Sequence, residues 1–374
     1  MELLKRRDPA HDLLIPYINE TQSMMNEAIS LFDKTAVCQI VPAVDLGFPH
    51  DVIRIAGGFA TGMFVEWRCN VPFIPIDTTV NIDTSSIFEL EEDVSDDINE
   101  LDFEKLRDKM SESSYLFNFH KGNHFISFCH STETDKPLLI IHSNEKEFKY
   151  QFNGLMPVRG NWFMDDVKIF QKGERYLRYI TGQKAELFTD MAKMLEEYNF
   201  IRHRFVANLI VGNKTKIISQ KDHNHYFMPT RKSVAIGCFP VTYGDEVPIF
   251  SKLGRDIFIF KPEKGGENIL TSLNSNKEYL LTPHGWGKTC EKDIEFCINY
   301  TTNEFDLSGD KYKIEPLVSL GKDKRLQIRE FDTNPNNENS LFVQMRKSCP
   351  GIVVDRIVQK CSYSQFGFNR HTSI

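Results

Sequence analysis

The stretch ERYLRYITGQKAELFTDMAKMLEEYNFIRHRFVANLI, residues 174–210, decides which fold class this chain can adopt. Its apolar side chains recur every three or four residues, which is the spacing that one face of a helix presents. The positions with this spacing are Leu177, Ile180, Phe188, Met191, Leu195, Tyr198, Ile201, Phe205 and Leu209. The pattern predicts one long helix, or a helical pair broken near Gly182, whose apolar stripe belongs to a core.

The rest of the chain predicts mixed elements rather than a regular alternation of strands and helices. Residues 19–32 and 99–113 have helical spacing. Alternating or continuous apolar runs predict strands at 125–129, 137–141, 225–227, 233–239, 247–250, 256–260 and 352–358. Residues 265–266 and 334–339 predict surface loops. No repeat or linker divides the chain, so we expect a single α+β domain, residues 1–374, with 174–210 as a helical excursion within it.

Composition places the chain among globular proteins. Its 374 residues are 41% hydrophobic and 26% charged, which is enough to bury a large core. No basic start with an apolar run and cleavage site is present, and no uncharged stretch has the length of a membrane span. The eight cysteines are scattered without a C-x-x-C pair. We therefore expect reduced thiols and a cytoplasmic location, or a nuclear one in a eukaryote, with no membrane partner.

The net charge of −7 argues against a uniformly basic nucleic-acid coat, but the charge is unevenly distributed. Residues 86–112 are rich in carboxylates, whereas residues 201–233 are basic. The cations of this basic region are Arg202, Arg204, Lys214, Lys216, Lys221, Arg231 and Lys232. A phosphate-bearing partner would bind this basic region, and the alternative is an ordinary solvated face.

The candidate chemistry lies in a subset of the eleven histidines. His284 stands in the glycine turn His284-Gly285-Trp286-Gly287-Lys288, where small neighbours leave its imidazole open to a ligand. His124 follows a Gly-Asn step, His142 ends an apolar strand, and His223 precedes an asparagine. Imidazole nitrogen suits manganese, iron, cobalt, nickel, copper and zinc, so the set predicts a polar, histidine-built site. The histidines that lack such surroundings predict structural roles: His11, His50, His120, His130, His203 and His371.

Four short motifs occur in a fixed order. They are GNHF at residues 122–125, IHS at 141–143, HN at 223–224 followed by Arg231-Lys232, and PHGWGK at 283–288. Together they resemble the motif series of the RtcB-type RNA-splicing ligases, and the likeness runs over nearly the whole chain. The resemblance implies a single RtcB-like domain, with mixed β-sheets around a central metal and nucleotide cleft.

The resemblance also implies an activity. The family joins RNA 3′-phosphate or 2′,3′-cyclic phosphate ends to 5′-hydroxyl ends with GTP and manganese, two ions in all, through a guanylylated histidine. By position, His284 is that nucleophile, and the implied metal ligands are His124, His142, His223 and Asp83. The implied nucleotide contacts are Asn123, Asn224, Gly285, Gly287, Lys288 and Lys252. The implied partners are RNA with 3′-phosphate and 5′-hydroxyl ends and an accessory activating protein.

Some motif positions depart from the family pattern. Ser86 stands where the family has a metal-bridging cysteine, and Lys288 stands where it has an arginine. The early Pro-Asp-Val-His pattern appears here as Pro42-Ala43-Val44-Asp45. Because of these departures, two alternatives to the ligase remain. The first is a noncatalytic RNA-end-binding or regulatory protein, and the second is an enzyme for metal-dependent phosphoester hydrolysis.

Overall fold

A computed structural model describes residues 9–145, 148, 151–152, 159–251, 253–286, 288–290, 294–315, 318–320, 326–328 and 340–371. Its helices are α1 (Pro9–Ser30), α2 (Val52–Ala56), α3 (Glu100–Glu112), α4 (Gln183–Val211), α5 (Leu341–Ser348) and the 3-10 turns η1 (Ile76–Thr78), η2 (Ser95–Asp97) and η4 (Met164–Asp166). None of the helices in the described part of the chain combines the length and hydropathy needed to cross a bilayer.

One large sheet runs through the molecule. Among the described residues its strands lie in the order β1 (Val37–Gly47), β2 (Thr61–Arg68), β10 (Ser233–Ile236), β9 (Ile217–Thr230), β4 (Asp83–Leu90), β6 (Pro137–Ser143), β5 (Phe125–Ser131), β21 (Gly351–Ser364), β13 (Ile257–Pro262) and β12 (Val247–Ile249), with β22 (Gly367–Arg370) beside β21. Groups of two or three neighbouring strands come in turn from the first and from the second half of the chain. The sheet therefore joins parts that are distant in the sequence.

The described residues also form four small sheets. They are β11 (Cys238–Val241) with β15 (Glu278–Pro283) and β14 (Ile269–Thr271); β16 (Lys288–Cys290) with β20 (Leu326–Ile328); β17 (Phe296–Asn299) with β18 (Glu304–Leu307) and β19 (Asp310–Lys313); and β3 (Phe73–Pro75) with β8 (Arg175–Thr181) and β7 (Lys168–Lys172). Every strand pairing in the described residues is antiparallel, so the α+β class expected from the sequence is confirmed.

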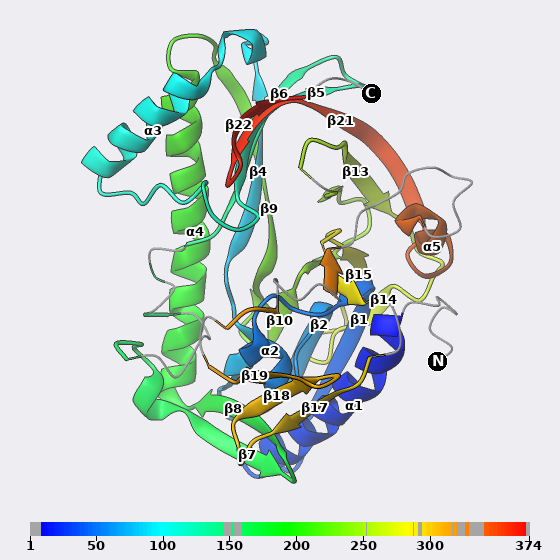
Figure 1. Ribbon diagram of the computed structural model, residues 1–374. Helices are drawn as coiled ribbons and strands as arrows, with labels where there is room; N and C mark the ends of the chain where they lie inside the picture. The colour runs from blue at the N-terminus through cyan, green and yellow to red at the C-terminus, as the bar shows by residue number, and fades with distance from the viewer. Residues whose placement is uncertain are drawn as a thin grey trace.

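The long helix α4 runs beside the large sheet, as Figure 1 shows in green. It begins only at Gln183, because the preceding Gly182 has φ +66° and residues 175–181 form strand β8 instead. The helix expected over 174–182 is therefore wrong. Five consecutive residues of β8 are buried, since both faces are covered, so the alternation that identifies a strand is hidden. Arg178 on β8 forms a buried ion pair with Asp77.

The other helices and strands predicted from the sequence are present with shifted bounds, but fourteen of the strands in the described residues were not predicted. Helix α3 is capped by Asn99, whose side chain accepts from the backbone N–H of Leu101, while Asp102 accepts from the N–H of Asn99. Helix α1 begins at Pro9 rather than at residue 19, because its first half also buries apolar side chains against the sheet. The predicted strands correspond to β5, β6, β9 to β13 and β21. The loop expected at 334–339 lies outside the described residues.

Candidate active site: a row of buried histidines

His284 follows the end of β15 and is held by a carboxylate. Its Nδ1 lies 2.7 Å from Oδ2 of Asp45 on β1, and the same oxygen accepts the backbone N–H of Gly285 at 2.8 Å. Both side chains are buried, with 1% and 0% of their surface exposed. Because a carboxylate only accepts, Nδ1 of His284 carries the proton and the lone pair of the imidazole is on Nε2. Within the described residues, Nε2 has no hydrogen-bond partner.

Three further imidazoles continue from His284 in a row. The ring of His225 lies 5.5 Å from that of His284, and the ring of His142 lies 5.1 Å from that of His225 and is stacked on it. His124 follows at 6.1 Å from His142. We call these four residues the histidine row. They come from β5 or its N-terminal side, β6, β9 and the end of β15, so the sheet topology assembles them.

His142 has both ring nitrogens engaged. The amide of Asn123 donates to Nε2 at 3.1 Å, so Nδ1 carries the proton and donates to Oγ of Ser85 at 3.0 Å. Burial, and then the charge of His284, lowers the pKa of His142 to about 3. His142 is therefore a neutral imidazole at pH 7. His124 similarly donates Nδ1–H to the carbonyl of Asn118 at 3.1 Å.

His225 is the exception in the row. It is 0% exposed, and among the described residues neither Nδ1 nor Nε2 has a partner with full hydrogen-bond geometry, although the backbone of His223 lies near the ring and opposes the lowering of its pKa. An orphaned buried nitrogen costs about 1–3 kcal/mol, so such a residue points to a ligand or to stored strain. Burial lowers the pKa of His225 well below its ordinary value, so the ring is neutral. The sequence singled out His223 instead of this residue.

A β-bulge explains why His225 reaches the row. Asp83 pairs with Tyr226 and Thr84 pairs with Asn224, so His225 is the extra residue on β9. A bulge re-aims side chains and strengthens the local twist. Sequence spacing alone places His223 and His225 on one face of a strand and cannot say which of them is shifted inward.

Two aromatic rings cover the row. Trp286 lies 5.0 Å from His142 and stacks on Phe250 at 4.8 Å, while its indole N–H donates to the carbonyl of Ser251 at 2.8 Å. The backbone N–H of Phe250 donates to the carbonyl of His284 at 3.0 Å. The side chain that the glycine turn was expected to expose is therefore enclosed.

Asp83 joins the site through Tyr226, whose ring lies 5.9 Å from that of His284. Burial, with smaller contributions from Asp83 and Asp45, raises the pKa of Tyr226 to about 12. Gly237 makes this packing possible. A Cβ at Gly237 would lie 3.0 Å from both Cε1 of His284 and the hydroxyl of Tyr226, and its φ of +67° also favours glycine.

Ser86 faces away from the histidine row, toward α4. Its hydroxyl donates to Asp222 and therefore accepts from Nδ1–H of His203, which is 2.7 Å away. Nε2 of His203 then accepts from Ser143 at 2.6 Å, and Ser143 accepts from Arg202. This buried chain runs in one direction from a guanidinium to a carboxylate and fixes a neutral His203, whose pKa burial lowers. His203 thus has the structural role expected of it.

Two predicted site residues lie apart from the row. His223 lines a cavity of about 530 Å³ with Asp222, Phe239 and Glu246, and burial lowers its pKa to about 4. The amide oxygen of Asn224 accepts from Thr84 at 2.6 Å on the α4 side of the sheet, so it does not point to the histidine row. Among the described rings, none from the row contacts His223.

For three of the predicted nucleotide contacts the structure describes no side-chain position. Gly287 and Lys252 lie outside the described residues, and of Lys288 the structure describes the backbone of β16. Gly285 has φ +108°, which agrees with the turn expected there.

The basic region 201–233 is largely neutralised. Lys214 pairs with Asp102 at 3.0 Å, Lys216 with Glu91 at 3.3 Å and Lys221 with Glu246 at 3.7 Å. Arg202, a residue of α4, is fully buried. The first two pairs join the basic region to the acidic segment 86–112, so the uneven charge of the sequence partly cancels in space.

The histidine row has donors of the right chemistry for a transition metal, because neutral imidazole nitrogens bind such ions. Its geometry does not complete a site. In the part of the chain that the structure describes, no three histidine, cysteine or acidic side chains are placed to hold one ion. Both nitrogens of His142 are hydrogen-bonded, whereas both of His225 lack a partner.

The chain matches no protein-family model, no curated protein and no solved structure at a significant level. The function of the histidine row is therefore argued from its own chemistry. The fold and the row together define an α+β protein whose largest sheet buries a line of neutral imidazoles ending at an Asp-oriented histidine.

Proposed function

We propose that this chain is a divergent RtcB-type RNA ligase that uses GTP to join an RNA 3′-phosphate end to a 5′-hydroxyl end. The observation that carries the proposal is the Asp45–His284 pair. A buried carboxylate that holds Nδ1–H leaves Nε2 as the nucleophilic nitrogen, which is the arrangement required for covalent catalysis by histidine.

The proposed first step takes place at Nε2 of His284. Nε2 attacks the α-phosphorus of GTP, the N–P bond forms, and the P–O bond to pyrophosphate breaks with pyrophosphate leaving. Asp45 stabilises the positive charge that the imidazole gains, while Nδ1 keeps its proton. An oxygen of the RNA 3′-phosphate then attacks the same phosphorus and releases His284. Finally the 5′-hydroxyl attacks the activated 3′-phosphate, and GMP leaves.

Manganese belongs to the proposal because of the donor chemistry of the row. The buried nitrogens of His225, which lie beside both His142 and His284, lack a hydrogen-bond partner with full geometry among the described residues, and so does Nε2 of His284. When bound, the metal would neutralise phosphate oxygens of the nucleotide. Asn123 would have to release Nε2 of His142 before that nitrogen could bind an ion.

Covalent labelling tests the proposal. The wild-type protein, incubated with α-³²P-GTP and manganese, should acquire an acid-labile, alkali-stable label, and His284→Ala should acquire none. His130→Ala is the matched control, because His130 pairs with the exposed Asp135 far from the row, and it should label normally. The absence of label on the wild type with every nucleoside triphosphate and divalent metal tried would contradict the ligase.

One observation favours a second candidate, a noncatalytic RNA-end-binding protein of the same fold. His284 is 1% exposed, and Phe250 and Trp286 pack over the row, so a nucleotide has to displace side chains to reach Nε2. Trp286→Ala removes the larger ring and separates the two candidates. The ligase predicts faster labelling of this variant. The binding protein predicts salt-sensitive binding of RNA ends, with no label on either the variant or the wild type.

A further inference from the structure

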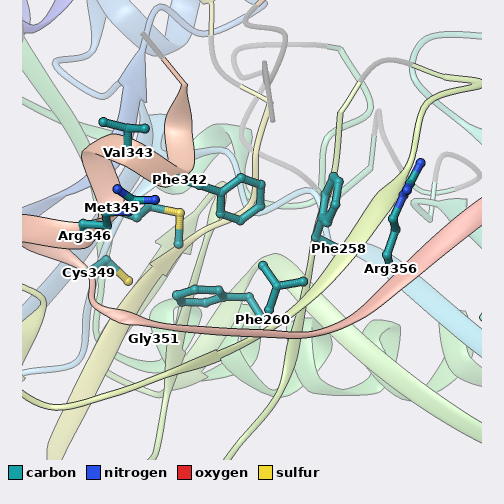
Figure 2. Close-up of a pocket in the computed structure, with 10 residues that line it drawn as sticks. Phe258, Phe260, Phe342, Val343, Met345, Arg346, Cys349, Gly351 and Arg356 are labelled. Carbon is teal, nitrogen blue, oxygen red and sulfur yellow. The ribbon is translucent and has the colours of Figure 1, made fainter. Parts of the chain in front are cut away.

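A second cavity, of about 370 Å³, opens between α5 and the strands β13 and β21. Figure 2 shows the rings of Phe258, Phe260 and Phe342 around it. Phe258 and Phe342 meet edge to face at 5.1 Å, and Met345 is part of the same buried cluster. The volume lies at the small end of the range for small-molecule sites, about 300–1,000 Å³. No lining residue is shared with the histidine row.

The charges at this cavity have one sign. Its lining includes Arg346 on α5 and Arg356 on β21, and no acidic residue. Nε of Arg356 pairs with Asp256 at 2.5 Å. Arg346 is exposed, and within the described residues it has no carboxylate partner. The two guanidiniums lie on opposite sides of the apolar walls in Figure 2. The cavity therefore combines an apolar interior with a cation at its edge that has no carboxylate partner in the described part of the chain.

This combination selects a ligand class. A nucleobase would stack on the rings, but its polar edges would face Phe260, Met345 and Val353, and each unpaired polar group buried there costs about 1–3 kcal/mol. An aliphatic chain loses nothing in the same surroundings, and methionine adapts to its shape. A carboxylate on that chain can form a bidentate pair with a guanidinium.

We propose that this cavity binds a free, medium-chain apolar carboxylate, with its chain among the three phenylalanines and its carboxylate at Arg346. The site is independent of the proposed ligase activity. It gives the molecule a ligand that neither RNA chemistry nor the histidine row requires.

Calorimetric titration of the full chain with decanoate, below its micelle concentration, tests the site. We expect saturable binding of one decanoate per chain. Arg346→Glu should weaken it by about tenfold or more, because a charge-assisted bond is lost and a repulsion is gained. Val353→Trp, at a half-exposed wall position, should also weaken it by filling the cavity. Arg107→Glu on α3 makes the same charge change on a distant exposed helix and should leave the affinity within about twofold.

Circular dichroism and thermal melting show that each variant is folded. The proposal is overturned if decanoate does not saturate, if Arg346→Glu binds as tightly as the wild type, or if decanol and decyltrimethylammonium bind as tightly as decanoate. Displacement of decanoate by a short single-stranded oligoribonucleotide at the same site would assign the cavity to nucleic acid instead, and would also overturn it.

Discussion

Asp45 and His284 are 239 positions apart in the chain, yet their side chains form the pair on which the proposed chemistry rests. The sequence identified His284 from its glycine setting, but it offered Asp45 only as a departure from a motif. A carboxylate beside an imidazole fixes the tautomer and stabilises the charged form of the ring. Asp45, which stands where the RtcB-type motif has a histidine, therefore orients the ring of His284.

Asp45→Asn tests this task. Asparagine keeps the shape and an acceptor oxygen but removes the charge that stabilises the reacting imidazole. We expect the rate of GTP labelling to fall by at least about a hundredfold, within the range for loss of an acid–base partner. Thermal melting should show a folded protein. Asp96→Asn on the surface is the control, and equal rates for the two variants would remove Asp45 from the site.

His225 and His203 form a natural comparison, because both are fully buried and, among the described residues, partners with full hydrogen-bond geometry are found for His203 but not for His225. In the metal-free protein, His225→Leu should leave the free energy of unfolding unchanged or raise it by about 1–2 kcal/mol, since orphaned nitrogens are removed. His203→Leu should lower it by about 2–5 kcal/mol, since Ser86 and Ser143 lose their partner. Urea unfolding measures both. A large loss of stability for His225→Leu alone would show that the protein satisfies that ring itself.

At the scale of elements, the register of β4 decides which serine faces which side of the sheet. Ser85 pairs with His142 in the β4–β6 ladder and bonds its ring, so the next residue, Ser86, faces α4. A strand alternates its side chains with period two, so a shift of one residue would exchange the two serines. The resemblance drawn from the sequence aligned Ser86 with a metal-bridging cysteine, whereas the described geometry places Ser86 in the hydrogen-bond chain that ends at Asp222.

Ser86→Cys distinguishes these two placements. A thiol is a weak donor and acceptor, so in the His203 chain it should lower the free energy of unfolding by about 1–2 kcal/mol and leave GTP labelling unchanged. Urea unfolding and the labelling assay measure the two effects. If Ser86→Cys is labelled faster by GTP in manganese and is as stable as the wild type, the side chain at position 86 contacts the metal instead.

The elements also show where sequence patterns were sufficient. α3 and β5 were predicted to within two residues at each end, although six of the seven residues of β5 are buried. β8 was missed because it is buried on both faces, and its apolar residues also satisfy helical spacing. The helix of 174–210 was correct from residue 183 onward, where one face alone is buried. A short apolar run can also reveal a strand that is buried on both faces, as in β5 and β6, but not when the run satisfies helical spacing as well, as in β8.

At the scale of the whole molecule, burying neutral histidines links stability to pH. The pKa of His142 falls from 6.5 to about 3 and that of His223 from 6.5 to about 4. As the pH drops below 6.5, the unfolded chain takes up protons first. The contribution is therefore complete above pH 6.5 and is lost progressively toward pH 3–4.

Urea unfolding at two pH values measures this linkage. Between about pH 7 and pH 5, each of these histidines should cost about 2 kcal/mol of unfolding free energy. His223→Gln should show a shallower dependence by about one proton, whereas His130→Gln, at a partly exposed position, should keep the slope of the wild type. Equal stability at both pH values would contradict the neutral state of His142 and His223 in the folded protein.

The sequence by itself determined the α+β class, the long helix from residue 183, eight of the 22 strands in the described residues and the candidate histidines His124, His142 and His284, because these depend on local periodicity and on turn chemistry. Only the tertiary structure decided that a bulge brings His225 into the row, that Asp45 holds His284, and that Ser86 and Asn224 face α4. These features depend on strand register and on pairing between distant segments. No local pattern carries that information, because register is set by how whole strands pack together.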